Sequence, residues 1–334
     1  MNTSSYPKIT HSKVLVTGGA GFIGSNLIED LLRYHNKVVC LDNFSTGKQS
    51  NVAPFLAHPD FTLITGDIRH PEDCAKAVKG IDIVLQQAAL GSVPRSLKDP
   101  FTTNEVNVTG FLNMLIAARD AGVKRFVYAA SSSTYGDSTQ LPKVEEIIGK
   151  PLSPYAVTKL VNELYAHVFA LNYGMEVIGL RYFNVFGKNQ DPDGAYAAAI
   201  PKFIKLLIQH QSPTINGTGS NSRDFTYIAN VLQMNHLAAT TRNKETIGQV
   251  FNTAVGERSD LNTLIHLLKN ELSRYDAGIQ DVSIQYGPER AGDIPHSLAS
   301  VDKARRLLGY QPSHSLEQGL KESVDWYWHA LKNN

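Results

Sequence analysis

Short, nearly uninterrupted apolar runs alternate with stretches of helical spacing through the first half of the chain. The apolar runs are Lys13–Thr17, Lys37–Leu41, Phe61–Thr65, Asp82–Leu85, Arg125–Ala130 and Glu176–Leu180. The stretches with helical spacing are Phe22–Arg33, Thr103–Ala121 and Val157–Leu171. Continuous apolar runs are typical of strands that are buried on both faces, and strands that alternate with helices form βαβ units. The pattern therefore predicts an α/β fold with a doubly wound parallel sheet.

The alternation changes after about residue 182. Asn184–Ala195 is rich in Asn, Asp, Gly and Pro, a composition that is typical of loops. Later helices are expected at Ile200–Gln209, Leu261–Leu272 and Leu316–Lys332, and Val250–Thr253 resembles another short strand. We expect a sheet domain over residues 1–181 and a smaller part over residues 182–334, mainly for substrate, from which some segments return to the sheet.

Composition narrows the class of protein. The chain has 334 residues, with 32 Lys and Arg against 31 Asp and Glu, so its formal net charge is +1. This balance argues against a nucleic-acid-binding protein, which needs a cationic surface. There is no apolar run of membrane-spanning length, and Met1–Ser12 lacks the apolar core of a signal peptide, so we expect a cytoplasmic protein without a membrane partner. Cys40 and Cys74 have no metal-ligand spacing around them, so we expect small core side chains and no metal.

A glycine-rich turn follows the first predicted strand. Residues 17–24 read TGGAGFIG, which places Gly18, Gly21 and Gly24 three residues apart at the start of a helix. In such a turn the first glycine permits a tight bend, the second lets a diphosphate approach, and the third lets the helix pack closely on the strand. The helix N-terminus then offers unpaired N–H groups to the anion. Asp42 ends the next strand, where an acidic residue binds the adenosine ribose of NAD and repels the 2′-phosphate of NADP.

The three-residue spacing of these glycines resembles the extended branch of the short-chain dehydrogenase/reductase superfamily. Asp42–Gly47, Gly66–Ile68 and Gln87–Ala89 resemble that branch's adenosine-ribose loop, its adenine contact and the backbone that passes the cofactor. The resemblance runs from about residue 13 to about residue 312 and implies a Rossmann-like NAD domain over residues 1–181. The cofactor residues that it implies are Gly18, Gly21, Phe22, Ile23, Gly24, Asp42, Asn43, Ser45, Thr46, Gly47, Asp67, Ile68, Ala88, Ala89, Tyr155, Lys159 and Tyr182.

Tyr155 and Lys159 form a YxxxK pair on one face of a predicted helix. A lysine ammonium there can lower the pKa of the phenol from about 10 toward neutral pH, which would make it a base for a sugar hydroxyl. Ser131, Ser132 and Ser133 follow the preceding strand, and the arrangement resembles the Ser/Thr–Tyr–Lys triad of the family. The family's spacing to a downstream Tyr–Gly dipeptide selects Ser131 as the triad serine, while Ser132 and Ser133 lie close enough to contribute.

The two positions after Ser131 separate reaction classes within the family. Nucleotide-sugar 4,6-dehydratases carry Asp and Glu there, because the removal of water needs an acid and a base, and UDP-glucuronate decarboxylases carry a Glu. In this chain the positions hold Ser132 and Ser133, which do not titrate near neutral pH. The resemblance therefore favours reversible hydride transfer at C4 of a sugar.

Later stretches resemble the nucleotide-sugar site of the family. Arg181–Gly187 resembles the strand end whose Asn contacts a sugar diphosphate, and Thr214–Gly219 resembles the uridine-diphosphate wall. Arg223 and Arg290 would clamp the diphosphate, since guanidinium groups suit phosphate oxygens. The substrate residues that the resemblance implies are Gly91, Ser92, Ser131, Ser132, Ser133, Asn184, Gln190, Ala198, Thr214, Asn216, Arg223, Arg290, Asp293 and Ser297.

Ser297 bears on the choice of sugar. At this position a Tyr would be a point of resemblance to the galactose epimerases that are restricted to non-acetylated sugars. The small side chain of Ser297 leaves room for an N-acetyl group. Leu90–Ser96 likewise resembles the O-antigen UDP-N-acetylglucosamine 4-epimerases. The resemblance implies NAD-dependent 4-epimerisation of UDP-N-acetylglucosamine and UDP-N-acetylgalactosamine, for polysaccharide biosynthesis, by a homodimer. The alternatives are a UDP-glucose or UDP-glucuronate 4-epimerase and a non-catalytic NAD-binding sensor.

Overall fold

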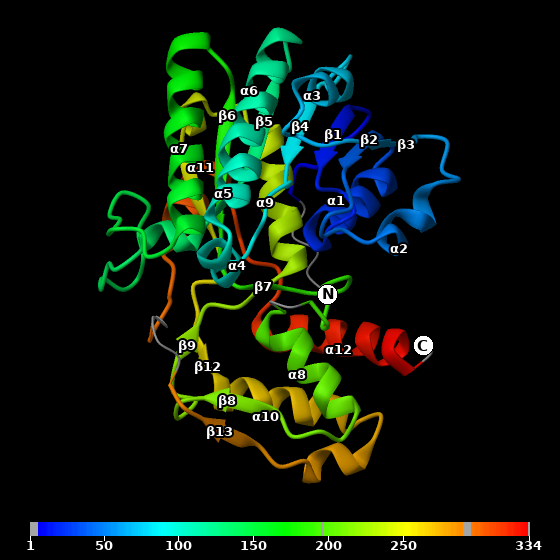
Figure 1. Ribbon diagram of the computed structural model, residues 1–334, viewed down its shortest axis with the longest axis vertical. Coiled ribbons are helices and arrows are strands. Elements are labelled where there is room, and N and C mark those ends of the chain that lie inside the picture. The colour runs from blue at the N-terminus through cyan, green and yellow to red at the C-terminus, as the bar shows by residue number, and fades with distance from the viewer. Residues whose placement is uncertain (1–5, 195–196, 290–294, 333–334) are drawn as a thin grey trace.

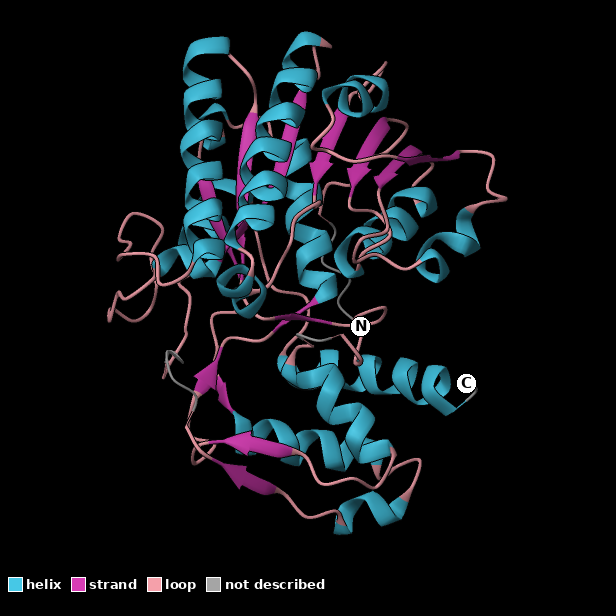
Figure 2. Cartoon of the chain, viewed as in Figure 1, coloured by secondary structure: helices cyan, strands magenta, loops and turns pink. Residues whose placement is uncertain are grey.

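The computed structural model describes residues 6–194, 197–289 and 295–332. Its core is a seven-stranded sheet in the order β11-β6-β5-β4-β1-β2-β3, and every neighbouring pair is parallel (Figures 1 and 2). The strands are β1 (Lys13–Thr17), β2 (Lys37–Asp42), β3 (Phe61–Thr65), β4 (Ile83–Gln86), β5 (Arg125–Ser131), β6 (Val177–Tyr182) and β11 (Val250–Thr253). The chain order reverses between β1 and β4, which opens a crevice at the carboxyl ends of these strands. The predicted α/β, doubly wound, Rossmann-like fold is confirmed.

Helices cover both faces of the sheet because strand residues alternate between two apolar clusters. Val14 and Val16 of β1 belong to one cluster, and Leu15 belongs to the other. Helices α1 and α9 lie on the first face, and α3, α6 and α7 lie on the second (Figure 1). The helices of this part are α1 (Phe22–Arg33), α2 (Gln49–Val52), α3 (Pro71–Ala77), α4 (Val93–Lys98), α5 (Pro100–Asn104), α6 (Phe111–Asp120), α7 (Pro154–Tyr173), α9 (Ile228–Thr240) and α11 (Asp302–Leu308). Cys40 and Cys74 are unpaired and fully buried, one in each cluster, as expected for small core side chains.

The long helix predicted over Thr103–Ala121 is present, and it contains a π-helical turn that the apolar spacing does not predict. Helix α5 ends at Asn104, residues 105–110 form a π-helical turn, and α6 begins at Phe111. Asn107 in this turn is buried, and its side chain accepts the Leu90 N–H at 2.8 Å and donates to the Leu90 carbonyl at 3.2 Å. Single π turns inside helices are often found at functional sites. Here the turn coincides with the residue that holds the loop after β4.

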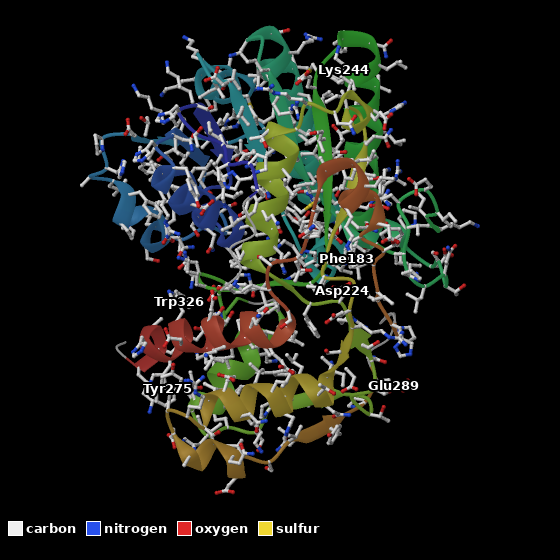
Figure 3. The ribbon with its side chains drawn as sticks, turned by 180° about the vertical axis from the view of Figure 1, so that it is seen from behind. Phe183, Asp224, Lys244, Tyr275, Glu289 and Trp326 are labelled. Carbon is white, nitrogen blue, oxygen red and sulfur yellow. The ribbon has the colours of Figure 1, made fainter. Side chains whose placement is uncertain are left out.

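A second part of the molecule lies beyond the carboxyl ends of the strands (Figures 1 and 3). Its elements are β8 (Thr214–Asn216), β9 (Ser222–Arg223), β12 (Ser259–Asp260), β13 (Gln285–Gly287), α8 (Ala199–Ile208), α10 (Leu261–Leu272) and α12 (Leu316–Lys332). Strand β13 pairs with β8, and β12 pairs with β9. A two-stranded ribbon of β7 (Val185–Phe186) and β10 (Thr226–Tyr227) lies between this part and the sheet. No helix within the described ranges combines the length and the apolar character that a membrane crossing requires.

Asp224 lies at the junction between the two parts of the molecule, where its side chain accepts hydrogen bonds from the backbone (Figure 3). Its carboxylate is fully buried and accepts the backbone N–H groups of Val255 and Gly256 at 3.0 Å and of Ala299 at 3.3 Å. Burial raises its pKa to about 6, although these three hydrogen bonds oppose the shift. One side chain therefore ties three backbone segments together.

The chain returns to the sheet after it has built much of the second part. Strand β11 pairs with β6 and forms the edge of the sheet, and α9 packs on the sheet's first face. The division of the chain at residue 182 stays a prediction, since residues on both sides of it contribute to the same sheet.

Candidate active site

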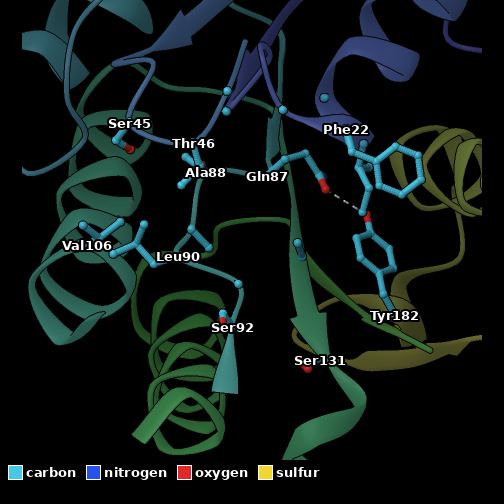
Figure 4. Close-up of a pocket in the computed structure, with 18 of the residues that line it drawn as sticks. Phe22, Ser45, Thr46, Gln87, Ala88, Leu90, Ser92, Val106, Ser131 and Tyr182 are labelled. Carbon is cyan, nitrogen blue, oxygen red and sulfur yellow. Dashed lines mark hydrogen bonds between the residues drawn. The ribbon is translucent and has the colours of Figure 1, made fainter. Parts of the chain in front are cut away.

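A cavity of about 590 Å³ lies at the carboxyl ends of the central strands (Figure 4). Gly18 after β1, Asp42 at the end of β2, Gln87 after β4, Ser131 at the end of β5 and Tyr182 at the end of β6 all line it. Every residue that the sequence suggested for cofactor binding lines this cavity. The topology brings them together because parallel strands present their carboxyl ends at one edge of the sheet.

The glycines of the first turn make a backbone-lined wall. Gly18 has a φ of +65°, and a Cβ on it would lie 2.8 Å from the backbone nitrogen of Ala88. A Cβ on Gly24 would lie 2.2 Å from the Gly18 carbonyl oxygen, so any side chain there would push α1 away from the turn. Helix α1 begins at Phe22, and its first N–H groups have no partner within the helix. This wall suits the close approach of a diphosphate.

Two carboxylates mark the opposite end of the cavity. Asp42 is buried, which raises its pKa, while it accepts the N–H groups of Phe44 at 2.7 Å and of Ala20 at 2.8 Å. Burial opposes ionisation of Asp67 too, but hydrogen bonds from Arg69 and Asn43 lower the pKa of Asp67 to about 2. Carboxylate oxygens suit the hydroxyls of a ribose and repel a phosphate, so this end fits the adenosine of NAD.

The predicted triad residues line the other end of the cavity. Tyr155 lies in the first turn of α7, which Ser153 caps by accepting the Ala156 N–H at 3.2 Å. Lys159 lies one turn later, and its Nζ donates to the Ala129 carbonyl of β5 at 2.8 Å. Ser131, Tyr155 and Lys159 all line the cavity, so strand β5 and helix α7 present one serine, one phenol and one ammonium together.

Burial governs the electrostatics of Tyr155 and Lys159 in the structure. Burial raises the pKa of Tyr155, and a hydrogen bond with Ser131 only partly opposes this. Burial also lowers the pKa of Lys159 to about 8, which Glu163 on the next turn of α7 opposes. In the protein without cofactor, burial therefore dominates the pKa of both groups, and the lowering of the Tyr155 pKa by Lys159 together with the positive nicotinamide stays a prediction.

The three serines have different positions. The Ser131 hydroxyl oxygen accepts the Ser133 O–H at 2.9 Å and the Ser133 N–H at 3.1 Å. Ser132 lines the cavity together with Ser131, whereas Ser133 is not one of the residues that line it. This geometry favours Ser131 as the triad serine, which Ser133 holds in place by donating two hydrogen bonds to its hydroxyl oxygen.

A second cavity of about 400 Å³ continues toward the lower part of the molecule. Asn184 lines both cavities, and Ala198, Thr214, Asn216 and Arg223 line the second one. The remaining predicted substrate residues that line the first cavity are Gly91, Ser92 and Gln190. Ten of the fourteen predicted substrate residues therefore line two cavities that share Asn184, and the first of these cavities contains the triad.

Besides Ser133, three predicted substrate residues are not placed in these cavities. Arg290 and Asp293 lie outside the described residues. Ser297 is half-buried and lines neither of the two cavities; its N–H donates to the Ser222 carbonyl at 3.0 Å. This hydrogen bond joins Ser297 to β9, the strand that carries Arg223. Ser297 is therefore connected through β9 to a residue that lines the second cavity.

Several residues line the first cavity without having been predicted as site residues. These are Leu41, Gly66, Gln87, Leu90, Val93, Val106, Ala129, Ala130 and Val185. Leu41, Ala129 and Ala130 lie in the last three residues of a sheet strand, and Gly66 and Gln87 directly follow one. Such positions can be found from the sequence, because the carboxyl ends of the strands face the crevice. Val106 does not lie at such a position, since it reaches the cavity from the π-helical turn.

Comparisons with known proteins agree with this geometry. Residues 14–254 match the model of the NAD dependent epimerase/dehydratase family. A UDP-glucose 4-epimerase of Lactobacillus helveticus is 34% identical over 339 residues, which cover 95% of this chain and 97% of that protein. The structure of a UDP-N-acetylglucosamine 4-epimerase from Methanobrevibacter ruminantium, in complex with UDP-N-acetylmuramic acid, is 36% identical with a TM-score of 0.89 and covers 96% of this chain and 100% of that one. The structure of a UDP-glucuronic acid 4-epimerase from Bacillus cereus, in complex with UDP-glucuronic acid and NAD, is 32% identical with a TM-score of 0.85. This match covers 95% of this chain and 99% of that one.

Proposed function

Because the chain belongs to the NAD-dependent epimerase/dehydratase family, we propose that it is a UDP-sugar 4-epimerase that interconverts UDP-N-acetylglucosamine and UDP-N-acetylgalactosamine. NAD is the cofactor, and the cavity fits it. The glycine wall that a Cβ would fill would hold the diphosphate, and Asp42 would accept hydrogen bonds from the adenosine ribose hydroxyls. Bound NAD would supply the acceptor for the C4 hydride of the sugar and its later donor.

The observation that carries the reaction type is the absence of an acid beside the triad. Among the described residues that line the first cavity, the carboxylates are Asp42 and Asp67, and both lie at the adenosine end. The triad end offers hydroxyls at Ser131 and Ser132, the phenol of Tyr155 and the ammonium of Lys159. These groups can move the proton of a hydroxyl, but they lack the acid–base pair that would expel water from a neighbouring carbon.

The chain's own residues supply the proton transfers. Tyr155 accepts the proton of the C4 hydroxyl as the C4–H bond breaks, so that a 4-keto sugar forms. The hydroxyl of Ser131 accepts two hydrogen bonds from Ser133, so its own proton is directed at the Tyr155 oxygen and can pass to the C4 oxygen beside it. Since burial raises the pKa of Tyr155, ionisation of the phenol depends on the positive charges of Lys159 and of the oxidised nicotinamide ring.

Room at Gly91 supports an N-acetylated sugar, and Gln190 offers a contact that such a sugar can use. A Cβ built on Gly91 meets nothing within 4 Å, so the wall of the cavity beside Ser92 is open. The Nε2–H of Gln190 donates to the Val185 carbonyl at 3.1 Å, and its buried Oε1 has no hydrogen-bond donor among the described residues. An amide N–H on the sugar, or a hydroxyl, would supply the missing donor.

The alternatives are separated by a substrate panel. UDP-glucose and UDP-glucuronic acid are the named substrates of related epimerases, so either could replace the N-acetylated sugars. Purified protein is incubated with UDP-N-acetylglucosamine and no added NAD, and the sugar nucleotides are separated by anion-exchange chromatography. We expect UDP-N-acetylgalactosamine to form faster than UDP-galactose forms from UDP-glucose. Turnover of UDP-glucose or UDP-glucuronic acid without turnover of UDP-N-acetylglucosamine would overturn the proposed substrate. No turnover of any of these sugars would favour the alternative of a non-catalytic NAD-binding sensor.

An exposed apolar surface supports a homodimer. Helix α7 presents apolar residues at helical spacing on its outer face, next to α4 and α5 (Figure 1). The exposed side chains are Leu97, Phe101, Val157, Leu164, Val168 and Leu171. A patch of this kind is a candidate interface. Light scattering coupled to gel filtration should give twice the mass of one chain, and Leu171→Lys should reduce it to one.

A further inference from the structure

The two polar atoms of the Gln87 side-chain amide differ. Its oxygen has a hydrogen-bond partner, and its nitrogen has none among the described residues. Gln87 follows β4 and lines the first cavity. Its Oε1 accepts the Tyr182 O–H at 3.1 Å (Figure 4). Its Nε2 is buried and makes no hydrogen bond to any described residue. A buried donor without a partner is costly, so its place in a ligand cavity needs a reason.

The orientation of this amide follows from its neighbours. The Val231 carbonyl can only accept, so the atom of Asn235 that lies 2.8 Å from it must be Nδ2. The same Nδ2 donates its second hydrogen to the Tyr182 hydroxyl at 3.0 Å. The hydroxyl donates its single proton to the Oε1 atom of Gln87, so that the oxygen of the amide faces Tyr182. Nε2 is therefore the group that stays unpaired, and the chain of bonds keeps it there.

The position of the amide points to the cofactor. Figure 4 shows the Gln87 and Tyr182 side chains meeting beside Phe22, the first residue of α1. The amide therefore lies close to the helix N-terminus that suits a diphosphate and on the wall that ends at Tyr182. Ligand groups there that lack a hydrogen of their own are the diphosphate and carboxamide oxygens of NAD, and an N–H donor matches them.

We propose that Gln87 Nε2 donates a hydrogen bond to an acceptor oxygen of bound NAD. Gln87 is then a cofactor-binding residue, and Tyr182 and Asn235 are positioning residues that fix which end of its amide faces the ligand. The inference rests on NAD binding alone and goes beyond the proposed sugar specificity.

NAD binding without any sugar tests the proposal. Protein freed of NAD is titrated with NAD in a calorimeter, and the NAD retained through gel filtration is measured after acid extraction. Gln87→Met keeps the length of the side chain and removes the donor, so we expect about tenfold weaker binding. Gln87→Glu keeps the acceptor for Tyr182 but turns a carboxylate toward the cofactor, so we expect about a hundredfold weaker binding. Tyr182→Phe frees the amide to rotate and should weaken binding by about threefold.

Gln280→Glu, on an exposed side chain of the lower part, is the control for the added charge and should bind NAD as the wild type does. Melting temperatures without NAD show whether each variant is folded, and Gln87→Met decides if Gln87→Glu does not fold. Wild-type NAD affinity in Gln87→Met would overturn the proposal, because the unpaired amide would then face only water. That result would leave the substrate panel unaffected, since no sugar is turned over in this experiment.

Discussion

The adenosine end and the sugar end of the site are assembled in different ways. At the adenosine end, Gly18, Asp42 and Asp67 each follow the strand of one βα unit, and the sheet places them side by side. At the sugar end, Asn216 and Arg223 come from strands of two or three residues that pair with segments more than 30 residues away. The first kind of wall follows from local sequence, whereas the second depends on the whole lower part being folded. Variants of the two ends should therefore fail in different assays.

The largest effect is expected where the two ends meet, at Tyr155. Tyr155→Phe removes the proton acceptor but keeps the ring, so kcat should fall by about 10³-fold while NAD content stays unchanged. Initial rates and acid-extracted NAD are measured on the same preparation. Tyr165→Phe, on the same helix and only partly buried, is the control and should keep its rate. A Tyr155→Phe enzyme with more than a tenth of the wild-type rate would contradict the assignment.

The next effect compares one glycine from each end. Gly24→Ala places a Cβ 2.2 Å from the Gly18 carbonyl, so it should cost about 3 kcal/mol of unfolding free energy and most of the bound NAD. Gly91→Ala adds a Cβ to open space and should leave both unchanged. Denaturant unfolding and NAD content are measured for both variants. Equal losses in the two variants would mean that the glycine wall has no special relation to the cofactor.

The third effect is expected at Arg223 in the sugar end, where a substitution should change sugar binding and leave NAD binding unchanged. Its guanidinium donates to the carbonyls of Ser222 and Pro295 and lines the second cavity, the proposed site of the sugar nucleotide. Arg223→Ala should raise the KM for the UDP-sugar by about 30-fold, without loss of NAD. Arg258→Ala, on an exposed arginine after β11, is the control. If Arg223→Ala instead releases NAD at an unchanged KM, the two ends are not separate.

The smallest effect is expected from pH. Burial lowers the pKa of Lys159 to about 8, so its ammonium is present below that pH and is lost as the pH rises through it. Loss of this charge removes support for an ionised Tyr155, so kcat should fall by roughly tenfold between pH 7.5 and 9.5. Lys159→Arg stays charged over this range, and its residual rate should show no such fall. A flat profile for the wild type would place the rate-limiting step outside proton transfer.

The sheet and the adenosine end were predictable because their signals are local. The apolar runs gave all seven strands, and the glycine spacing with Asp42 pointed to residues that do line the cavity. Each depends on a strand and the turn after it, which lie within one short stretch of sequence.

The remaining features depend on contacts between distant residues. The bonds that orient Gln87 join residues 87, 182 and 235, and no periodicity relates these positions. The pKa of Tyr155 depends on burial under the finished fold. The π-helical turn places Asn107 against Leu90 and has no pattern of its own in the apolar spacing.

The late arrival of β11 has a consequence for synthesis of the chain on the ribosome. Strand β6 is buried along its whole length, but its outer edge stays unpaired until residues 250–253 have emerged. An exposed apolar sheet edge is prone to pair with other chains. Truncation after residue 182, which the sequence suggests as a natural boundary, would make that exposure permanent. A shorter version of the cofactor part should therefore aggregate unless β11 is supplied with it.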